Sequence, residues 1–405
     1  MNSKGVGIVG MGARGLSSLG RVICEIGAES GLHIAAITDV HPQRLADGKE
    51  HLTELHRRNG VTPRFRTHTG VEELIADDSV DVVMITTPQF AHEEPFALAA
   101  AAGKDIYCDK PLAHDQSACD RMQAVWEQHQ PRCLAGLTRR YEDVWRRSAD
   151  LVADGVVGTP RMLLLRSVIP YHLYLGGGWW RRRELSGDIL NEKASHHFDV
   201  LNWFADSEVV SVHATGGRGT FAPRPGYPEH CVDCDRVCAY RRPPRNESGE
   251  QFTGGMFRLA YDDDPHELLR RDLCVYSDNA DILDHAVVSL AFANGVKAVL
   301  FLSVFGPNID DQETLEVVGD TGRLRLTRHT GRISLDQLGG AHQEIDARSP
   351  EHGESHFGAD RTLVRDLGRF STGRPETVGF AAAHAASSVA FAAVRSLDSK
   401  DDLVS

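Results

Sequence analysis

A glycine-rich turn near the start of the chain constrains the fold most strongly. Gly10, Gly12 and Gly15 follow a short apolar stretch, residues 4–9, and precede a stretch of helical periodicity. In a strand–turn–helix unit, this spacing permits a tight bend, the close approach of a pyrophosphate and close packing of the helix on the strand. We predict a dinucleotide-binding turn formed by Gly10, Gly12, Ala13, Arg14 and Gly15. The alternative is a glycine-rich turn that holds no ligand.

The rest of residues 1–138 alternates between predicted strands and helices. Strands are predicted at residues 32–38, 81–86, 105–108 and 133–138. Such alternation predicts a parallel sheet in a doubly wound α/β (Rossmann) domain. Asp39 ends the second strand, where a carboxylate binds the ribose hydroxyls and repels a 2′-phosphate; a turn cap is the alternative. The sequence therefore favours NAD, and Arg44, close behind, keeps NADP as the less favoured cofactor.

The ligand-binding edge of such a sheet lies at the carboxyl ends of its strands. Thr87, Pro88 and His92 follow one strand, and we expect them to line the nicotinamide end of the cofactor site; for His92 a structural cap is the alternative. Asp109 and Lys110 follow the next strand and are also expected beside the cofactor. The proline after the lysine keeps it out of the helical region, in an extended turn that points to the open edge. We predict that Lys110 acts on a substrate hydroxyl.

These motifs resemble those of the glucose–fructose oxidoreductase/inositol dehydrogenase (Gfo/Idh/MocA) family. The resemblance covers nearly the whole chain and rests on the glycine turn, on Thr87-Pro88 with His92, and on the lysine–proline turn. The family usually carries Glu-Lys-Pro, whereas Asp109 precedes Lys110 here, with a shorter reach toward the lysine. The resemblance implies a second, α+β domain with a large, mainly antiparallel, open-faced sheet. It also implies an NAD(P)-dependent oxidoreductase that acts on CH–OH groups.

A helix expected between residues 187 and 205 carries the second set of candidate residues. Glu192, His196 and Asp199, at i, i+4 and i+7, share one of its faces. Histidine titrates near neutrality and can take a proton from a hydroxyl, while a carboxylate one turn away orients it. A salt-bridged helix face is the alternative. The resemblance assigns catalysis, together with the lysine, to the positions of Glu192 and His196, with glutamate here in place of aspartate.

The longer glutamate side chain leaves two alternatives open. It could move the acid–base role from His196 to Glu192, or bring Lys193 into the site. We favour His196 as the base and Glu192 as its partner. Lys193 and His197 are expected at the substrate, and a structural role is the alternative for His197.

Two further stretches are candidates for substrate contact. The resemblance places an Arg/Tyr pair, here Arg140 and Tyr141, near the cofactor or substrate; a solvated helix start is the alternative. Trp180 and Arg181 follow three glycines, in a stretch expected to form a mobile loop. Tryptophan stacks on the faces of sugars, and arginine grips oxygen acceptors in a fork. A surface loop with an interface role is the alternative.

Three cysteines indicate a metal site in a weakly periodic insertion at about residues 215–280. Cys231, Cys234 and Cys238 have Cys-x2-Cys-x3-Cys spacing, which in a reducing compartment indicates metal binding rather than disulfides. Three thiolates can occupy three corners of a Zn²⁺ tetrahedron, with a structural role. Candidates for the fourth ligand are Cys274, His213, His266 and His230. An iron–sulfur cluster and three unliganded thiols are the alternatives.

Composition narrows the classes of partner. The net charge of −13 argues against nucleic acid or a membrane surface as the main partner. No apolar run approaches the roughly 20 residues of a membrane span, and no signal peptide is visible, so we expect a cytoplasmic protein. Eight cysteines in 405 residues do not indicate a secreted disulfide scaffold. The resemblance implies a homodimer or homotetramer formed through the open sheet face.

We predict three regions: an NAD(P)-binding domain over residues 1–138, a substrate-binding and oligomerisation domain over residues 139–380, and a C-terminal helix, residues 381–405, that packs back on the first domain. A β-hairpin is predicted around Asn294-Gly295 in the second domain.

The expected function is an NAD-dependent dehydrogenase for a secondary hydroxyl of a sugar, glycoside or cyclitol. In this scheme His196, supported by Glu192, removes the hydroxyl proton, and Lys110 stabilises the charge that develops on the oxygen. One alternative is a redox-neutral enzyme, an epimerase, lyase or glycosidase-like enzyme that uses transient oxidation by retained NAD. The other is a non-catalytic NAD-binding sensor.

Overall fold

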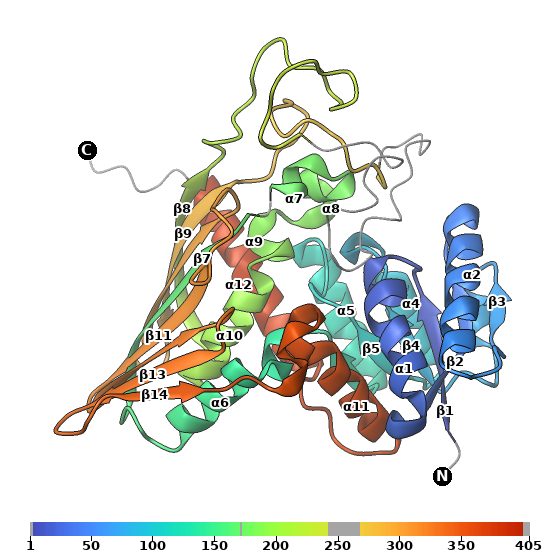
Figure 1. Cartoon of the computed structure of the whole chain (residues 1–405), viewed down its shortest axis with the longest axis horizontal. Coiled ribbons are helices and arrows are strands. Elements are labelled where there is room, and N and C mark those ends of the chain that lie inside the picture. Colours follow the sequence, from blue (N-terminus) through green and yellow to red (C-terminus); the bar gives the residue numbers. More distant parts are fainter. Residues whose placement is uncertain (1–2, 171, 242–267, 400–405) are drawn as a thin grey trace. The chain divides into compact units, whose positions relative to one another are not determined.

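The computed structural model describes residues 3–170, 172–241 and 268–399, and these form two compact units (Figure 1). The first unit comprises the described residues of Met1–Thr138 together with Ser355–His384, and the other described residues form the second. Each unit has its own sheet and its own apolar core. Part of the predicted insertion, including His266, lies outside the described residues.

The first unit contains a six-stranded parallel sheet in the order β3-β2-β1-β4-β5-β6. Its strands are β1 (Lys4–Val9), β2 (Leu32–Thr38), β3 (Arg66–His68), β4 (Val82–Ile85), β5 (Asp105–Cys108) and β6 (Cys133–Ala135). Its helical segments are η1 (Ala13–Gly20), α1 (Arg21–Ser30), α2 (Pro42–Arg58), α3 (Val71–Ile75), η2 (Gln89–Ala91), α4 (Glu93–Ala101), α5 (Gln116–His129), η6 (Ser355–Gly358) and α11 (Ala359–Ser371). Strands β1, β4 and β5 are apolar and almost wholly buried, as central strands of a parallel sheet should be. The predicted doubly wound fold is confirmed.

The second unit is built on an eight-stranded sheet in the order β14-β13-β12-β11-β7-β10-β9-β8. Its strands are β7 (Pro160–Val168), β8 (Val209–Gly217), β9 (His285–Phe292), β10 (Lys297–Ser303), β11 (Glu313–Gly319), β12 (Gly322–Thr327), β13 (Arg332–Gln337) and β14 (Gln343–Asp346). Its helical segments are η3 (Thr138–Tyr141), α6 (Asp143–Ala153), α7 (Leu173–Gly176), η4 (Trp179–Arg181), α8 (Arg183–Ser186), α9 (Ile189–Glu192), α10 (Ser195–Ala205) and η5 (Pro350–Gly353). Among the described strands of this eight-stranded sheet, β7 and β10 pair in parallel, and all other neighbouring strands pair antiparallel.

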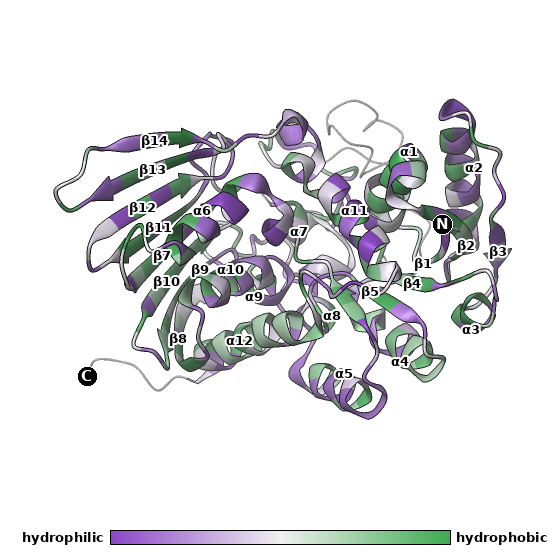
Figure 2. Ribbon diagram, turned by 90° about the horizontal axis from the view of Figure 1, so that it is seen from below, coloured by the Kyte–Doolittle hydropathy of each residue, from purple (hydrophilic) through white to green (hydrophobic). Residues whose placement is uncertain are grey.

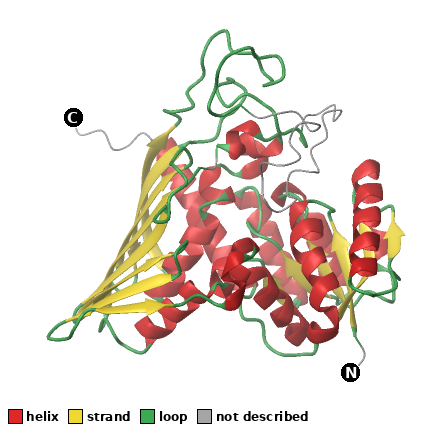
Figure 3. Ribbon diagram, in the orientation of Figure 1, coloured by secondary structure: helices red, strands yellow, loops and turns green. Residues whose placement is uncertain are grey.

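Helices of the second unit lie on one face of its sheet (Figure 3). On β7, Leu163 and Leu165 are 2% and 0% exposed, whereas Met162 and Leu164, which point to the other face, are 59% and 48% exposed. Burial that changes at every second residue is the pattern of a strand with one covered and one open face. The predicted open-faced, mainly antiparallel sheet is confirmed.

Helix α12 (Phe380–Asp398) belongs to both units. Its first turn is part of the first unit, where the ring of Phe380 stacks on Trp126 at 5.3 Å. The rest is part of the second unit, where the hydroxyl of Ser396 accepts a hydrogen bond from a backbone N–H of β8 at 3.0 Å. Of the predicted C-terminal region, residues 381–384 are thus part of the first unit, and the described residues from 385 to 399 are part of the second. An alanine-rich helix has small side chains on most of its faces, so its pattern did not indicate which unit it would contact.

The same helix is long and apolar enough, by length and composition alone, to cross a membrane, and Figure 2 shows its hydrophobic colouring. The prediction that no apolar stretch approaches the length of a membrane span does not hold for this helix. Core helices pass the same test, and 44% of the apolar window is buried inside the structure. Ala386, Ala390 and Ala393 are at most 1% exposed, which identifies core positions.

Four charged side chains form a buried cluster in the second unit. Glu313, at the start of β11, accepts hydrogen bonds from Arg139 at 2.9 and 3.1 Å and lies 3.5 Å from Arg328. Glu142 accepts hydrogen bonds from both arginines at 2.7–2.8 Å. Burial alone would raise the pKa of Glu313, but the charges of the arginines hold it well below its ordinary value. The cluster therefore consists of paired ions, as buried charges require.

Loss of one partner should leave an uncompensated charge in the core. We expect Glu313→Ala to lower the free energy of unfolding by about 3–5 kcal/mol, measured by urea denaturation. As a control, Asp336→Ala removes an exposed carboxylate that pairs with Arg323, and it should change stability little. The stabilisation by Glu313 is complete above the carboxyl pKa of the unfolded chain, about 4, and is lost as pH falls through the lower pKa of the folded state. Equal losses in the two variants would contradict this account.

Candidate active site

The glycine turn is held between three strands of the first unit. Gly10 has a φ of +96°, and its N–H donates to the carbonyl of Thr38 at 2.9 Å. The hydroxyl of Thr86 donates to the carbonyl of Gly10 at 2.9 Å. A Cβ at Gly15 would lie 2.3 Å from the Gly10 oxygen, so no side chain fits there. The turn therefore brings η1, and with it Ala13 and the helix that follows, close against β1.

The carboxylate of Asp39 supports this turn directly. It accepts hydrogen bonds from the N–H of Met11 at 2.7 Å and from that of His41 at 2.8 Å. Arg44 Nε lies 3.6 Å from the same carboxylate, and its terminal nitrogen lies 2.8 Å from where a Cβ on Gly12 would be. Asp39, predicted to bind the ribose, and Arg44, which kept NADP as the less favoured cofactor, thus lie side by side at the turn.

His92 connects the loops that follow β4 and β5. Its Nε2 lies 2.9 Å from the carbonyl oxygen of Thr87, and its Nδ1 lies 3.2 Å from that of Leu112. Burial lowers the pKa of His92, so the ring is neutral near pH 7. The side chain is 1% exposed. This placement gives His92 a positioning role between the Thr87-Pro88 loop and the lysine–proline turn.

Arg14 does more than fill the turn, because its guanidinium lies in a cluster of acceptors. It binds Asp360 at 2.5 Å, and Asp109 and the hydroxyl of Tyr107 at 3.3 Å. Burial alone would lower the pKa of Arg14, but the surrounding charges, that of Asp360 first, raise it well above its ordinary value. Asp109, which stands where the resembled family carries glutamate, also accepts from Tyr107 at 3.0 Å. The carboxylate of Asp109 is therefore directed to Arg14 and Tyr107. The next residue is Lys110, and the peptide bond between Lys110 and Pro111 is cis.

The second set of candidates lies on two consecutive helices, α9 and α10, rather than on one. Asp188 begins α9 and accepts from two backbone N–H groups, and burial raises its pKa to about 6. Glu192 ends α9 and is 6% exposed, and His196, in the first turn of α10, is 7% exposed. Asp199 binds Arg140 through three contacts of 2.8–3.1 Å. The predicted Arg140 therefore has a buried carboxylate partner.

His197 and Lys193 lie near the buried charge cluster. His197 Nε2 is 3.6 Å from Glu313, and burial lowers the pKa of His197 to about 4. The charge of Lys193, 4% exposed, contributes to the low pKa of Glu313. Sequence reasoning missed Glu313 and Asp360, because neither lies in a local motif and each acts on residues far away in the chain. The structural alternative for His197 fits its complete burial.

The stretch around Trp180 is not the bare surface loop that its glycines indicated. It forms η4 and α8, and Arg271 lies over the Trp180 ring, 4.0 Å from its centroid. Arg181 is 1% exposed, and its guanidinium donates to the carbonyl of Cys274 at 3.0 Å. Tyr141 is also buried, at 2% exposed. Arg181 and Trp180 thus contact residues of the segment that contains Arg271 and Cys274. The contact of Trp180, Arg181 and Tyr141 with a substrate stays a prediction.

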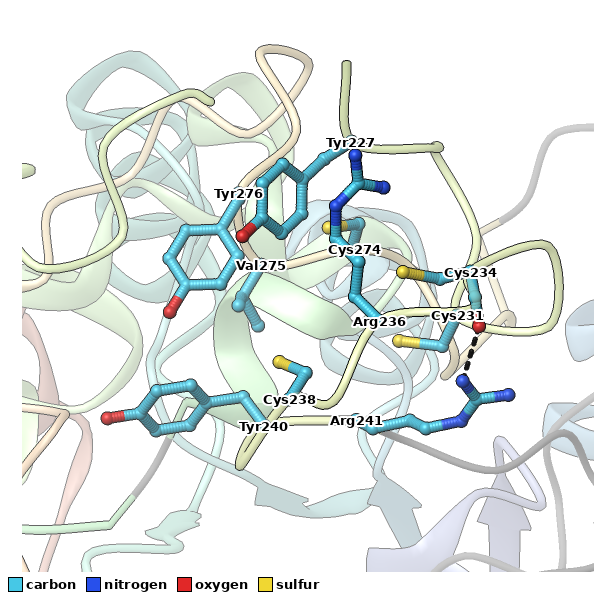
Figure 4. Close-up of a pocket in the computed structure, with 10 residues that line it drawn as sticks. All are labelled: Tyr227, Cys231, Cys234, Arg236, Cys238, Tyr240, Arg241, Cys274, Val275 and Tyr276. Carbon is cyan, nitrogen blue, oxygen red and sulfur yellow. Dashed lines mark hydrogen bonds between the residues drawn. The ribbon is translucent and has the colours of Figure 1, made fainter. Parts of the chain in front are cut away.

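The predicted metal ligands line one pocket of the second unit (Figure 4). Cys231, Cys234 and Cys238 come from one segment, and Cys274, a predicted fourth ligand, comes from another. Burial raises the pKa of Cys274, and nearby thiolate charges raise it further. Within the described residues, no group of three or more His, Cys, Asp or Glu side chains is arranged to hold a metal ion.

Comparison with known proteins matches both halves of the chain to models of one oxidoreductase family. Residues 4–137 match the family model described as "Oxidoreductase family, NAD-binding Rossmann fold", and residues 145–325 match that described as "GFO/IDH/MocA C-terminal domain". An inositol 2-dehydrogenase of Corynebacterium glutamicum (strain R) is 31% identical over 208 residues, which are 51% of this chain and 56% of that protein. The chain thus spans about half the length of the curated relatives it matches.

Two solved structures resemble the whole chain in fold. An oxidoreductase domain protein from Kribbella flavida has a TM-score of 0.75 at 18% identity, over 99% of this chain and 98% of that chain. Levoglucosan dehydrogenase in complex with NADH and levoglucosan has a TM-score of 0.71 at 16% identity, over 98% of this chain and 97% of that chain. Similarity at these identities shows the fold alone.

Gly12 and Gly15 of the turn should respond differently to an added methyl group. Gly15→Ala meets backbone, so we expect a loss of about 1–3 kcal/mol in unfolding free energy and loss of dinucleotide binding. Gly12→Ala meets only the movable end of Arg44, so stability should hold while dinucleotide binding, followed by calorimetry, weakens. Gly353→Ala, in open space, is the control. Full dinucleotide affinity in both turn variants would exclude this turn as the binding site.

Proposed function

Because this chain belongs to the Gfo/Idh/MocA oxidoreductase family, we propose that it is an NAD-dependent dehydrogenase that oxidises a secondary hydroxyl of a sugar, glycoside or cyclitol. The observation that carries the proposal is the burial of both Glu192, the last residue of α9, and His196, in the first turn of α10. A carboxylate and an imidazole at low exposure, four residues apart in the chain, are suited to moving a proton. The names of the relatives, an inositol dehydrogenase and a levoglucosan dehydrogenase, support a cyclitol or sugar derivative as the substrate class.

In the proposed reaction, His196 takes the hydroxyl proton and Glu192 supports the imidazolium that forms. Lys110, in the loop after β5, donates a hydrogen bond to the substrate oxygen and stabilises the negative charge that develops there. Bound NAD would supply the hydride acceptor. The glycine turn and Asp39 would hold its pyrophosphate and ribose, and Thr87 and Pro88 would lie at its nicotinamide.

Other properties of the chain are proposed with the function. A homodimer or homotetramer is supported by the open face of the eight-stranded sheet, where Met162, Leu164 and Phe301 are 46–59% exposed. A small-molecule substrate, rather than nucleic acid or a membrane, is supported by the net charge of −13. A cytoplasmic location is the expectation from composition.

Catalysis is tested with purified protein, NAD and a panel that begins with myo-inositol and levoglucosan, followed by the absorbance of reduced nicotinamide. We expect Lys110→Ala and His196→Ala each to reduce kcat by about 10²–10⁴-fold, the range of general acid–base and electrostatic effects. NAD binding should be unchanged, and Lys49→Ala, at an exposed position of α2, should behave like the parent protein. Parent-like rates in both site variants would exclude the mechanism. Substrate conversion without net reduced nicotinamide would favour the redox-neutral alternative.

Cofactor preference provides a separate test. We expect tighter binding of NAD than of NADP, because the carboxylate of Asp39 repels a 2′-phosphate. Asp39→Asn removes the charge next to Arg44 and keeps one acceptor oxygen for the turn. The ratio of the two dissociation constants should then move toward NADP by about tenfold, which corresponds to about 1.4 kcal/mol. Asp78→Asn, at an exposed position, is the control. An unchanged ratio would show that Asp39 does not select the cofactor.

A further inference from the structure

The four cysteines of the second unit are brought together by backbone pairing. Cys231 donates its N–H to the carbonyl of Asp272 at 2.7 Å, and Cys274 donates its N–H to the carbonyl of Glu229 at 2.7 Å. An isolated antiparallel bridge between the two segments lies inside this pair of bonds. The segment that carries three cysteines is thus fastened, at its first cysteine, to the segment that carries the fourth.

All four thiol groups line the same pocket (Figure 4). The segment turns tightly there, since Cys234 donates its N–H to the carbonyl of Cys231 at 3.3 Å. All eight cysteines are free thiols. The other four lie in the first unit, on its sheet and helices, so the pocket gathers every cysteine of the second unit.

We propose that Cys231, Cys234, Cys238 and Cys274 bind one Zn²⁺ ion as four thiolates, in a structural site. Zn²⁺ prefers a tetrahedron of thiolates in closed structural sites, and Cys-x2-Cys spacing is usual for one half of such a site. Binding replaces the four thiol protons, which go to solvent, and no electron is transferred. Cys274 is the fourth ligand, which the spacing of Cys231, Cys234 and Cys238 alone could not identify.

The proposed site requires the cysteine side chains to turn toward one another. In the described residues the thiols share the pocket without converging on one point. A cysteine sulfur moves between three staggered positions about χ1, and a metal ion selects the set that converges. Without a cation, four thiolates in one pocket would repel each other strongly.

The electrostatic surroundings favour a negatively charged centre. Arg236 and Arg241 both line the pocket, and the guanidinium of Arg241 donates to the carbonyl of Cys234. Zinc with four thiolates carries a net negative charge, which these two cations offset. Aromatic rings, among them those of Tyr240 and Tyr276, also line the pocket. An apolar lining of this kind lowers the polarity around a bound ion.

A structural ion also explains how this part of the chain holds its shape. Between β8 and β9, the described residues 218–241 and 268–284 contain no helix or strand. A segment with so little regular structure gains folding free energy from a metal site. Arg181 donates to the carbonyl of Cys274, so the ion would also fix the stretch that carries Trp180.

The test is metal analysis of the full-length protein, purified without chelator, by mass spectrometry for zinc and iron. We expect about one zinc and no iron per chain. Cys231→Ser and Cys274→Ser should each lower the zinc content at least tenfold after dialysis against a mild chelator. Cys119→Ala, which removes a buried thiol of the first unit, is the matched control and should keep the metal.

Cobalt replacement makes the test independent of how well the variants fold. Co²⁺ added to the zinc-depleted parent protein should give the visible absorption of a tetrahedral site with intense sulfur-to-cobalt charge transfer. Added Co²⁺ should also slow the alkylation of Cys234 and Cys238, the two half-buried cysteines of the pocket, as followed by peptide mapping. Stoichiometric iron would overturn the zinc assignment. Absence of metal from the parent protein, with no uptake of Co²⁺, would overturn the site, and full zinc retention in Cys274→Ser would remove Cys274 as a ligand.

Discussion

The buried carboxylate of Glu313 is the contact on which the second unit depends. It joins the first residue of β11 to Arg139, next to the start of α6, and to Arg328, just after β12. The ring of His197 on α10 lies 3.6 Å away. His196 is the neighbour of His197 on the same helical turn, so the proposed base lies on the part of α10 that packs beside this buried charge cluster.

In the first unit, the comparable constraint is the edge of the parallel sheet. Each loop at that edge is bound to its neighbour: Gly10 to Thr38 and Thr86, and Asp39 to the turn after β1. Arg14 then joins the turn to Asp109 after β5. Parallel strands present their carboxyl ends together, so loops far apart in the chain meet there. These bonds hold the loops of the edge together, which reduces the ordering that ligand binding must supply.

The sequence was sufficient for the fold because its signals are local. Glycine spacing and the alternation of strands and helices predicted the doubly wound sheet, and Asn294-Gly295 predicted the hairpin that β9 and β10 form. Partners separated by long stretches of chain were not visible, as with Arg14 and Asp360. A glycine run before Trp180 indicated mobility, although burial decided otherwise. Long-range pairing depends on tertiary packing, which no short motif encodes.

The position of His92 has a consequence for substitutions in the two loops that it contacts. Its two ring nitrogens each face the main chain of a different loop, one after β4 and one after β5. A neutral ring has a single N–H, so it donates to one of these carbonyl oxygens and packs against the other loop, and both loops are thus in contact with the same buried side chain. Sequence drift in one loop is then tolerated only if the spacing across the imidazole is preserved.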